Sequence, residues 1–447
     1  MKVEQVTLPK KYHDAVEHWR RHWIPDYGVL LRDWDKYFPK DEAFCLCAKM
    51  ELGTPDVVQI GDHQGEKKRV KPDELTEEEA KHLLAIIRAQ ASTEFGSIQQ
   101  HSATLHRAQD DDDRFWVMRV MAEELRHGYQ MFHLLLSEDW THVSGGVEGE
   151  EMVEEILSMQ TGSHVLDAFN VEYDTFIDNV VFAAFIDRVG KYQLTMQKVC
   201  AYKPMADSMP AMLREEAFHL AAGVIPMRKW AQRAAKGDTL VTMRTMQMSV
   251  NKWFPRALEM FGDERGGDTN IKFGFKDMKN REAQDLYIEE VRRMLRDING
   301  RFLRARFPDY GPDRVEQVLD ELERSRGKHD GVEFEDLLRL PDPRFFRRKG
   351  EPAWQMVGAD GETFADVDDY LRYLPKHLPA AYCTQRDMRM YADTLRKVAS
   401  GEYTVQDAVK KMPRLKRVGG TCPCSNSVRW VVEDGDAATA GNGGARR

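Results

Sequence analysis

Apolar residues along the chain recur at the spacing of an α-helix, and a few polar residues lie on the same stripes. In the clearest stretch, Leu83, Ile87 and Ile98 lie on one stripe with steps of three and four residues, and Gln90 and Glu94 occupy positions between them. Residues at such spacings share one face of a helix. The pattern therefore predicts a helix that turns an amide and a carboxylate towards the interior of the protein.

Polar residues ahead of apolar runs indicate where the first two helices begin. Residues 76–79 have the Thr-x-x-Glu form of a capping box, which predicts a first helix over about residues 76–107. Asp110 to Asp113 precede a second apolar run, and acidic side chains stabilise the first turn of a helix. We interpret this acidic run as a helix start, and not as a metal site, with the helix continuing to about residue 136.

Two further helices are predicted after a polar connection rich in glycine at residues 145–162. The third covers roughly residues 173–202. Ser208 and Pro210 predict the start of the fourth, because proline is tolerated in the first turn of a helix. Pro226 predicts the end of that helix or a kink in it.

One short motif occurs twice in these helical stretches. Glu124 and His127 form one Glu-x-x-His, and Glu216 and His219 form the other. At about 100° and 1.5 Å per residue, positions i and i+3 lie on one helix face about a turn apart. Each pair can therefore bind the same metal ion. Either copy alone would be interpreted as part of a solvated helix face.

Each motif has a matching carboxylate upstream in the preceding helix. Glu94 lies 30 residues before Glu124, and Asp187, which ends the apolar run at residues 180–186, lies 29 residues before Glu216. The chain therefore repeats a two-helix hairpin with an almost constant offset. A glutamate from each of two helices, with a Glu-x-x-His from each of the other two, is the ligand pattern of di-iron carboxylate bundles.

The pattern predicts an all-α fold: a ferritin-like di-iron four-helix bundle with N- and C-terminal extensions. Carboxylates buried without partners cost several kcal/mol, and a metal is the simplest partner for all of them. The predicted metal ligands are Glu94, Glu124, His127, Asp187, Glu216 and His219. We assign the first three to one iron and the last three to the other, with Glu124 and Glu216 as bridges. Manganese remains an alternative metal.

Residues with a predicted part in catalysis are Gln90, Glu94, Glu124, Asp187 and Glu216. Gln90 lies one turn from Glu94 and is either beside the metal site or a buried amide bonded to a neighbouring helix. Arg126 is expected to pair with a nearby carboxylate. The remaining histidines in this region lack a matched carboxylate and are expected in the core or at the surface. They are His101, His106, His133 and His164.

The predicted domain organisation has four parts. They are an irregular and helical layer at residues 1–72, the di-iron bundle at 73–262, a mixed and mainly helical region at 263–435, and a disordered tail at 436–447. Within the third part, residues 280–306 have a helical pattern rich in arginine and glutamate.

Net charge, apolar runs and cysteine spacing limit the partners and the cellular location that we expect for the protein. The net charge of −9 and the isoelectric point near 5.9 argue against nucleic-acid binding. No apolar run approaches the roughly 20 residues of a membrane helix, and the first residues lack an apolar signal core, so a cytoplasmic location is expected. The Cys45/Cys47 and Cys422/Cys424 pairs lack the usual Cys-x-x-Cys spacing and are interpreted as free thiols, with metal binding as a minor alternative.

Four stretches resemble the oxygenase component of benzoyl-CoA epoxidase and, more distantly, the catalytic subunit of phenylacetyl-CoA epoxidase. They are residues 90–94 (Gln-Ala-Ser-Thr-Glu), 123–127 (Glu-Glu-Leu-Arg-His), 187–193 (Asp-Arg-Val-Gly-Lys-Tyr-Gln) and 215–219 (Glu-Glu-Ala-Phe-His). Weaker similarity occurs at residues 65–68, 340–350, 360–361 and 374–375. The tail after about residue 383 matches no segment of the family.

The resemblance implies a monooxygenase that uses O2 and two iron ions to epoxidise the ring of an aromatic acyl-CoA, most of all benzoyl-CoA. The chain has no Gly-x-Gly-x-x-Gly loop and no four-cysteine cluster run, so the resemblance also implies a separate NAD(P)H-dependent reductase with flavin and iron–sulfur centres. The basic stretch at residues 344–349 is either a contact for CoA phosphates or a solvated loop. Alternatives are a di-iron hydroxylase or N-oxygenase of a non-CoA small molecule, and a ferritin-like iron oxidase.

Overall fold

The computed structural model describes residues 2–341, apart from residues 25, 162, 172, 174, 239, 240 and 263, together with a few isolated residues and two short strands further on. The basic stretch at residues 344–349, the Cys422/Cys424 pair and the tail at 436–447 lie outside the described residues.

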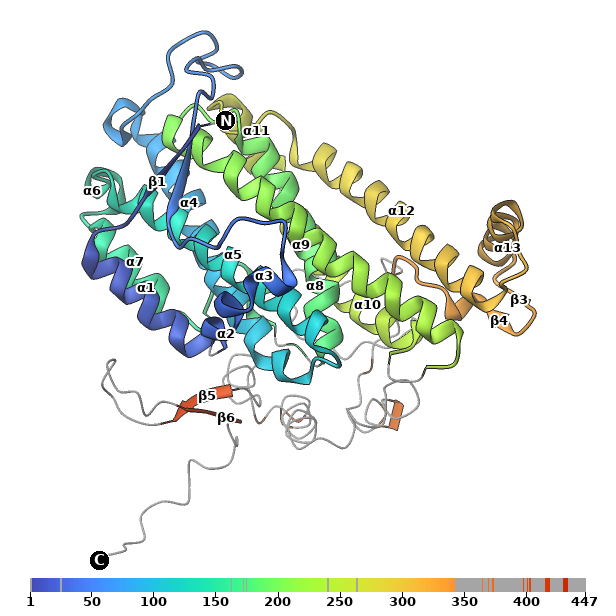
Figure 1. Cartoon of the computed structure of the whole chain (residues 1–447). Coiled ribbons are helices and arrows are strands. Elements are labelled where there is room, and N and C mark those ends of the chain that lie inside the picture. The colour runs from blue at the N-terminus through green and yellow to red at the C-terminus, as the bar shows by residue number, and fades with distance from the viewer. Residues whose placement is uncertain are drawn as a thin grey trace, which may run out of the picture.

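Four long helices form the centre of the molecule (Figure 1). They are α4 (Glu77–Thr104), α5 (Asp111–Leu136), α8 (Phe176–Gln197) and α9 (Lys203–Ala235). Helix α4 packs on α5, α8 packs on α9, and α5 joins the two hairpins by packing on α9. The all-α, ferritin-like four-helix bundle expected from the sequence is confirmed.

The polar caps start the first two bundle helices as the sequence predicts. The Thr76 side chain accepts a hydrogen bond from the backbone N–H of Glu79, and the Glu79 carboxylate accepts from the backbone N–H of Thr76 at 2.8 Å. Asp110 caps α5 by accepting from the backbone N–H of Asp113 at 2.8 Å. These contacts satisfy N–H groups that have no partner inside the helix.

The predicted start of the fourth helix was wrong. Helix α9 begins at Lys203, with Pro204 in its first turn, and both Pro210 and Pro226 lie inside it. Ser208 is an interior residue whose hydroxyl donates to the Pro204 carbonyl at 2.8 Å. Most helix stability in proteins comes from tertiary packing, and the packing of α9 on α5 and α8 outweighs the hydrogen bonds that internal prolines remove.

The connection between the two hairpins is more ordered than its glycine content indicates. It contains α6 (Thr141–Ser144), α7 (Gly149–Ser158) and the 3-10 turn η3 (Asp167–Asn170). Helix α7 packs on α4 and α5 and buries one apolar face there. Helix α8 then begins at Phe176, three residues later than predicted, and ends at Gln197, five residues earlier.

The N-terminal layer covers one side of the bundle. Strands β1 (Lys2–Val6) and β2 (Ala48–Leu52) pair antiparallel, with Lys2 opposite Leu52, and β2 lies against α5 and α9. Between the strands lie α1 (Lys10–Trp23), α2 (Tyr27–Arg32) and α3 (Trp34–Tyr37). Two 3-10 turns, η1 (Pro72–Glu74) and η2 (Leu105–Arg107), flank α4.

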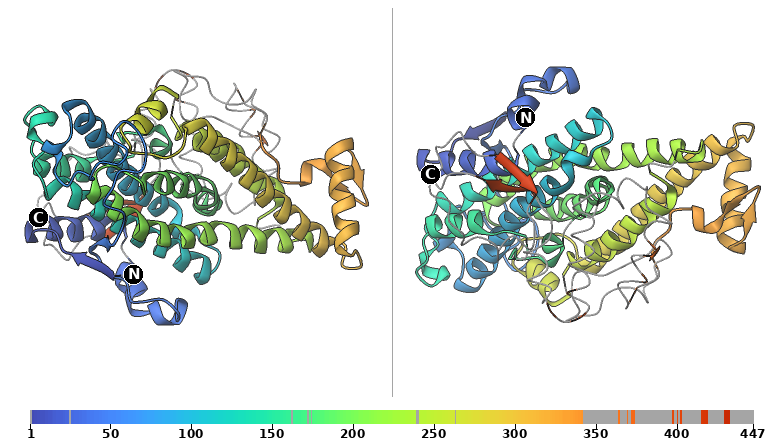
Figure 2. Two further views of the ribbon diagram at one scale, coloured as in Figure 1. Left: turned by 90° about the horizontal axis from the view of Figure 1, so that it is seen from above. Right: turned by 90° about the horizontal axis from the view of Figure 1, so that it is seen from below.

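Helices after the bundle extend it on the side of α8 and α9. They are α10 (Met243–Glu259), α11 (Glu264–Lys272), α12 (Asn280–Arg306) and α13 (Pro312–Ser325). Helix α12 covers the residues predicted to be helical and packs along α9, with α13 at its far end (Figure 2). Glu290 fastens α12 to α8 by accepting hydrogen bonds from Arg188, Lys191 and Tyr192.

Short elements complete the described chain. Strands β3 (Lys328–His329) and β4 (Val332–Glu333) pair antiparallel, the 3-10 turn η4 covers Phe334–Asp336, and β5 (Leu415–Val418) pairs with β6 (Arg429–Val432). In the described part of the chain, no helix has the length and apolar character needed to cross a membrane. The domain boundaries proposed from the sequence stay predictions.

Candidate metal centre

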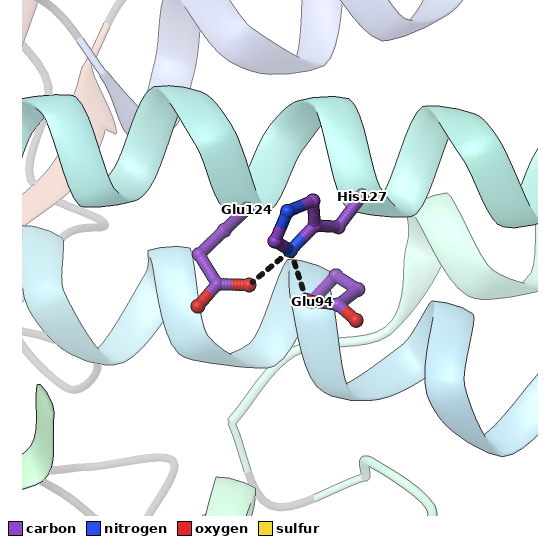
Figure 3. Close-up of side chains that lie close together, drawn as sticks. All are labelled: Glu94, Glu124 and His127. Atoms are coloured by element: carbon purple, nitrogen blue, oxygen red, sulfur yellow. Dashed lines mark ion pairs between the residues drawn. The ribbon is translucent and has the colours of Figure 1, made fainter. Parts of the chain in front are cut away.

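The first Glu-x-x-His motif lies on the inner face of α5 and meets a carboxylate from α4. Nδ1 of His127 is 3.6 Å from a carboxylate oxygen of Glu124 and 3.7 Å from one of Glu94 (Figure 3). All three side chains are buried. Their ligand atoms lie within 4.8 Å of one another, close enough to hold one metal ion.

The second motif lies on α9 and faces the first. Nδ1 of His219 is 3.5 Å from a carboxylate oxygen of Glu216 and 3.4 Å from one of Glu124. Glu216 in turn lies 3.8 Å from Nδ1 of His127. Glu124 therefore belongs to both groups of potential ligands, Glu94/Glu124/His127 and Glu124/Glu216/His219. A carboxylate shared in this way is placed to bridge two metal ions.

Asp187 on α8 is buried near these groups but belongs to neither. Burial raises its pKa well above the ordinary value, and the negative charges of Glu124 and Glu216 contribute. One turn further along α8, a Cβ at Gly190 would lie 3.2 Å from a carboxylate oxygen of Glu216. The α8 backbone therefore approaches the centre closely, while the short aspartate side chain reaches less far than a glutamate would.

Gln90 is half-buried, one turn before Glu94 on α4. Its amide oxygen is buried and makes no hydrogen bond to the described residues, and its backbone carbonyl accepts from the Thr93 hydroxyl at 2.7 Å. The structure joins Gln90 to neither group of potential ligands.

The acidic side chains of the centre are buried, and burial disfavours their charged forms. Burial raises the pKa of Glu94 to about 7, and burial together with the neighbouring Glu94 carboxyl raises the pKa of Glu124 well above its ordinary value. Burial opposes protonation of His127 and His219, but the surrounding carboxylates outweigh it and raise both pKa values. Without a metal, the centre must therefore retain protons that a bound cation would displace.

The donor atoms that face the centre lack other partners. Nδ1 of His127 and of His219, Oδ2 of Asp187 and Oε2 of Glu216 are buried and make no hydrogen bond to the part of the chain that the structure describes. Buried polar atoms without partners are costly, and a cation would satisfy them. Carboxylate oxygens with imidazole nitrogens suit iron or manganese. The residues present therefore fit the metal ions that the fold implies.

Two carboxylates that the sequence analysis did not single out lie beside the Nε2 atoms of the two histidines, one carboxylate for each histidine. Nε2 of His127 is 3.2 Å from Glu215 of α9, and Nε2 of His219 is 3.2 Å from Glu123 of α5. Each acid comes directly before a ligand glutamate in sequence but contacts the histidine of the other hairpin. The Glu-Glu doublet in both motifs was the available signal.

Each of these outer carboxylates is paired with cations. Glu215 accepts from Nε of Arg126 at 2.5 Å and from Lys49 at 2.9 Å, which confirms the expected pairing of Arg126 with a carboxylate. Glu123 accepts from Nε of Arg119 at 2.9 Å. Burial opposes ionisation of Glu215, but the positive charge of Arg126 and of its neighbours outweighs burial and lowers the pKa of Glu215. Each of the two carboxylates has an oxygen 3.2 Å from a histidine Nε2.

Other histidines and cysteines lie apart from the centre. His101 bonds to Asn179 at 2.8 Å, and His164 bonds to Gln99 at 2.9 Å, so both are core residues. The Cys45 and Cys47 thiols are 2.7 Å apart and free, as is Cys200. Among the described residues, only the two glutamate–histidine groups bring three potential metal ligands together.

A ferritin-like bundle with a buried carboxylate–histidine centre defines the class of protein. The chain matches the family model described as phenylacetic acid catabolic protein over residues 70–311, a span that contains all four bundle helices. It is 30% identical over 346 residues to benzoyl-CoA oxygenase component B of Aromatoleum evansii, and the alignment covers 70% of each chain. The chain therefore belongs to the phenylacetic acid catabolic protein family and is an oxygenase similar to that component, as the sequence resemblance indicates.

Proposed function

We propose that this protein is the oxygenase component of a multi-component, O2-dependent di-iron monooxygenase that epoxidises the ring of an aromatic acyl-CoA, most closely benzoyl-CoA. The observation that carries the proposal is the position of Glu124, which lies in both glutamate–histidine groups at the meeting point of two hairpins. A shared carboxylate between two histidine-containing groups is the arrangement needed to hold a pair of metal ions.

In this proposal each side chain of the centre has a role in holding the metals. Glu94 and His127 bind one iron, Asp187 and His219 bind the other, and Glu124 with Glu216 bridges them. The residues with a proposed part in catalysis are Gln90, Glu94, Glu124, Asp187 and Glu216. When bound, two ferrous ions supply the electrons that activate dioxygen. The protein holds the ligands in a buried site from which bulk water is excluded, and this protects the oxidising chemistry.

Support for the substrate and for the electron source comes from similarity. The similar protein from Aromatoleum evansii is named a benzoyl-CoA oxygenase, and the words "component B" place it in a system of several proteins. By analogy, we propose an aryl-CoA substrate and a separate NAD(P)H-dependent reductase with flavin and iron–sulfur centres. Function within a shared fold depends on the site, so the substrate needs a direct test.

The metal is tested by measuring iron per chain in protein expressed with ample iron. About two irons per chain are expected, because the site follows the di-iron ligand pattern. A Glu124→Ala/Glu216→Ala variant should lose them. Glu51→Ala is the matched control, because Glu51 is a buried glutamate that pairs with Arg214 and lies outside both groups. No iron in the parent after ferrous loading would overturn the metal assignment, and uptake far above two would favour an iron-storage role.

The substrate is tested with oxygen-18 gas and a chemical reductant. Incorporation of one labelled atom into benzoyl-CoA, with none into free benzoate or an aryl amine, is the expected result. Equal labelling of the free acid or the amine would contradict CoA specificity and would favour a hydroxylase or N-oxygenase. The metal assignment would stand.

A further inference from the structure

The two histidines of the centre differ in what lies beyond their outer carboxylates. On the His127 side, Glu215 meets Arg126, whose side chain is fully buried, and Lys49, whose side chain is 27% exposed. On the His219 side, Glu123 meets Arg119, and Arg119 also donates to Asp41 at 2.5 Å. The Asp41 side chain is 45% exposed. Contacts of 3.2, 2.9 and 2.5 Å thus lead from His219 to the surface.

Aromatic rings surround Arg119 along this line. Its guanidinium carbon lies 3.7 Å from the ring centroid of Phe218, 4.7 Å from that of Phe38 and 5.2 Å from that of Trp34. Phe38 contacts Phe218 edge-to-face at 5.6 Å and Trp34 at 4.8 Å. The cluster therefore connects Phe38, directly after α3, with Phe218 of α9, the residue before His219.

The cluster is buried for most of its length. Trp34, Phe38 and Arg119 are at most 8% exposed, and Glu123 is 4% exposed. In the described part of the chain, the structure places no aromatic ring over Lys49 or Arg126, so the Glu215 side has hydrogen bonds alone. Electron tunnelling weakens steeply with through-space gaps. Both sides offer short contacts that lead to the surface, and the Glu123 side differs in the polarisable rings that lie beside them.

We propose that electrons enter at Asp41 and α3 and reach the metal centre through Arg119, Glu123 and His219. This inference rests on the proposed function. The donor is a reduced flavin or iron–sulfur protein, which loses one electron in each transfer, and each ferric ion gains one electron to become ferrous. Two such electrons and two protons, with one O2, balance insertion of one oxygen atom into the substrate and release of the other as water.

The test attaches a ruthenium polypyridyl photoreductant at one of two exposed sites. Lys40→Cys places it next to Asp41, and Leu52→Cys places it on β2 near Lys49; both positions are exposed. The background carries Cys45→Ser, Cys383→Ser, Cys422→Ser and Cys424→Ser, so that the label reacts at the new thiol. After a light flash, the loss of ferric absorbance gives the rate of intramolecular reduction, a measurement that does not depend on turnover.

Arg119→Met should slow reduction from the Lys40 label several-fold and leave reduction from the Leu52 label unchanged. Trp34→Leu, which keeps the Arg119 ion pairs, should slow the Lys40 reaction to a smaller extent and provides a second variant if Arg119→Met folds poorly. Arg214→Met is the matched control, because Arg214 is the cation on the buried Glu51 and lies outside both glutamate–histidine groups, and it should not change the rate from the Lys40 label.

Equal slowing from both labels would show that Arg119 acts on the metal centre itself, and no slowing from either would show that electrons take another path. Either result overturns the proposed route. A parent protein with no ferric absorbance, by contrast, would remove the metal assignment, so failure of the route and failure of the proposed function have different outcomes.

Discussion

Each histidine that faces the centre is held from behind by a carboxylate of the opposite hairpin. An imidazole that carries its proton on Nε2, 3.2 Å from Glu215 or Glu123, presents an unprotonated Nδ1 to the centre, as a metal ligand would. Arg126 donates a hydrogen bond to Glu215, and Arg119 donates one to Glu123. The orientation of the two imidazoles is thus decided by side chains that lie outside both groups of potential ligands.

Replacing Glu215 or Glu123 by glutamine should weaken metal binding while leaving the fold intact. Glutamine keeps the size of the side chain but loses the charge that fixes the histidine, and loss of such partners costs about 10–100-fold in metal affinity. Competition for iron against a chelator of known affinity measures the change.

Glu51→Gln is the control for this comparison, because it removes the charge of a buried glutamate whose partner is Arg214. An affinity for Glu215→Gln equal to that of the control would contradict the role given to the outer carboxylates.

At the scale of helices, the backbones of α8 and α9 approach closely one turn from His219. A Cβ at Gly223, four residues after His219, would lie only 2.3 Å from the backbone nitrogen of Ala184. Real Cβ atoms do not come so close, so glycine is required where these two helix backbones meet. The small residues let α8 bring Asp187 towards ligands carried by α9.

Gly223→Ala should force α8 and α9 apart. Insertion of a methyl group into a close-packed interface costs about 1–3 kcal/mol, and the separation should also lower the iron content by moving Asp187 away from His219. Urea unfolding of the metal-free protein, with iron analysis of the loaded protein, measures both effects.

Gly28→Ala is the matched control, since Gly28 lies in α2 and has no atom within 4 Å of the position that a Cβ would take. That change should stabilise the protein by up to about 1 kcal/mol through helix propensity. Similar stability for the two variants would show that the α8–α9 contact can relax.

At the scale of the whole molecule, the centre links all four bundle helices and makes stability depend on pH and metal. Glu94, Glu124 and Asp187 have raised pKa values, in each case chiefly because of burial. An acid whose folded pKa is raised binds more protons in the folded state than in the unfolded state. Its contribution is complete below its ordinary pKa and is lost as the pH rises through the folded value.

The centre of the metal-free protein should therefore contribute less stability as the pH rises from about 5 to 8, since the pKa of Glu94 is near 7 in the folded state and its ordinary value is 4.5. The raised pKa of His127 acts in the same direction. Glu215, whose pKa is lowered below its ordinary value, acts oppositely below about pH 4.5, and His101, His106 and His164, whose pKa values burial lowers to about 4, act oppositely below about pH 6.5. Thermal unfolding across this pH range, with and without iron, measures the effect.

Bound metal should raise the Tm most at the upper end of the range, because it replaces protons that the apo centre is losing. A Glu94→Gln variant should have a weaker pH dependence in the apo form. The same pH dependence in the parent and in Glu94→Gln would show that the acids of the centre are not held as the structure indicates.

Local patterns determined much of this protein from sequence alone. The starts of α4 and α5 follow from side chains that cap their own helices, and the repeated Glu-x-x-His with its matched carboxylate predicts the bundle, because both depend on spacing along one chain. The start of α9 did not follow, because packing on its neighbours carries the helix through Pro210.

Contacts between helices were decided only by the tertiary structure. Spacing shows that Glu124 and His127 share a face, but the placement of Glu124 beside His219, and of Glu215 and Glu123 behind the histidines of the opposite hairpins, depends on how α5 lies against α9. The same holds for Arg119, which gathers Trp34, Phe38 and Phe218 from distant parts of the chain. Helical periodicity is a local property of the chain, whereas these neighbours are chosen by the packing of segments far apart in sequence.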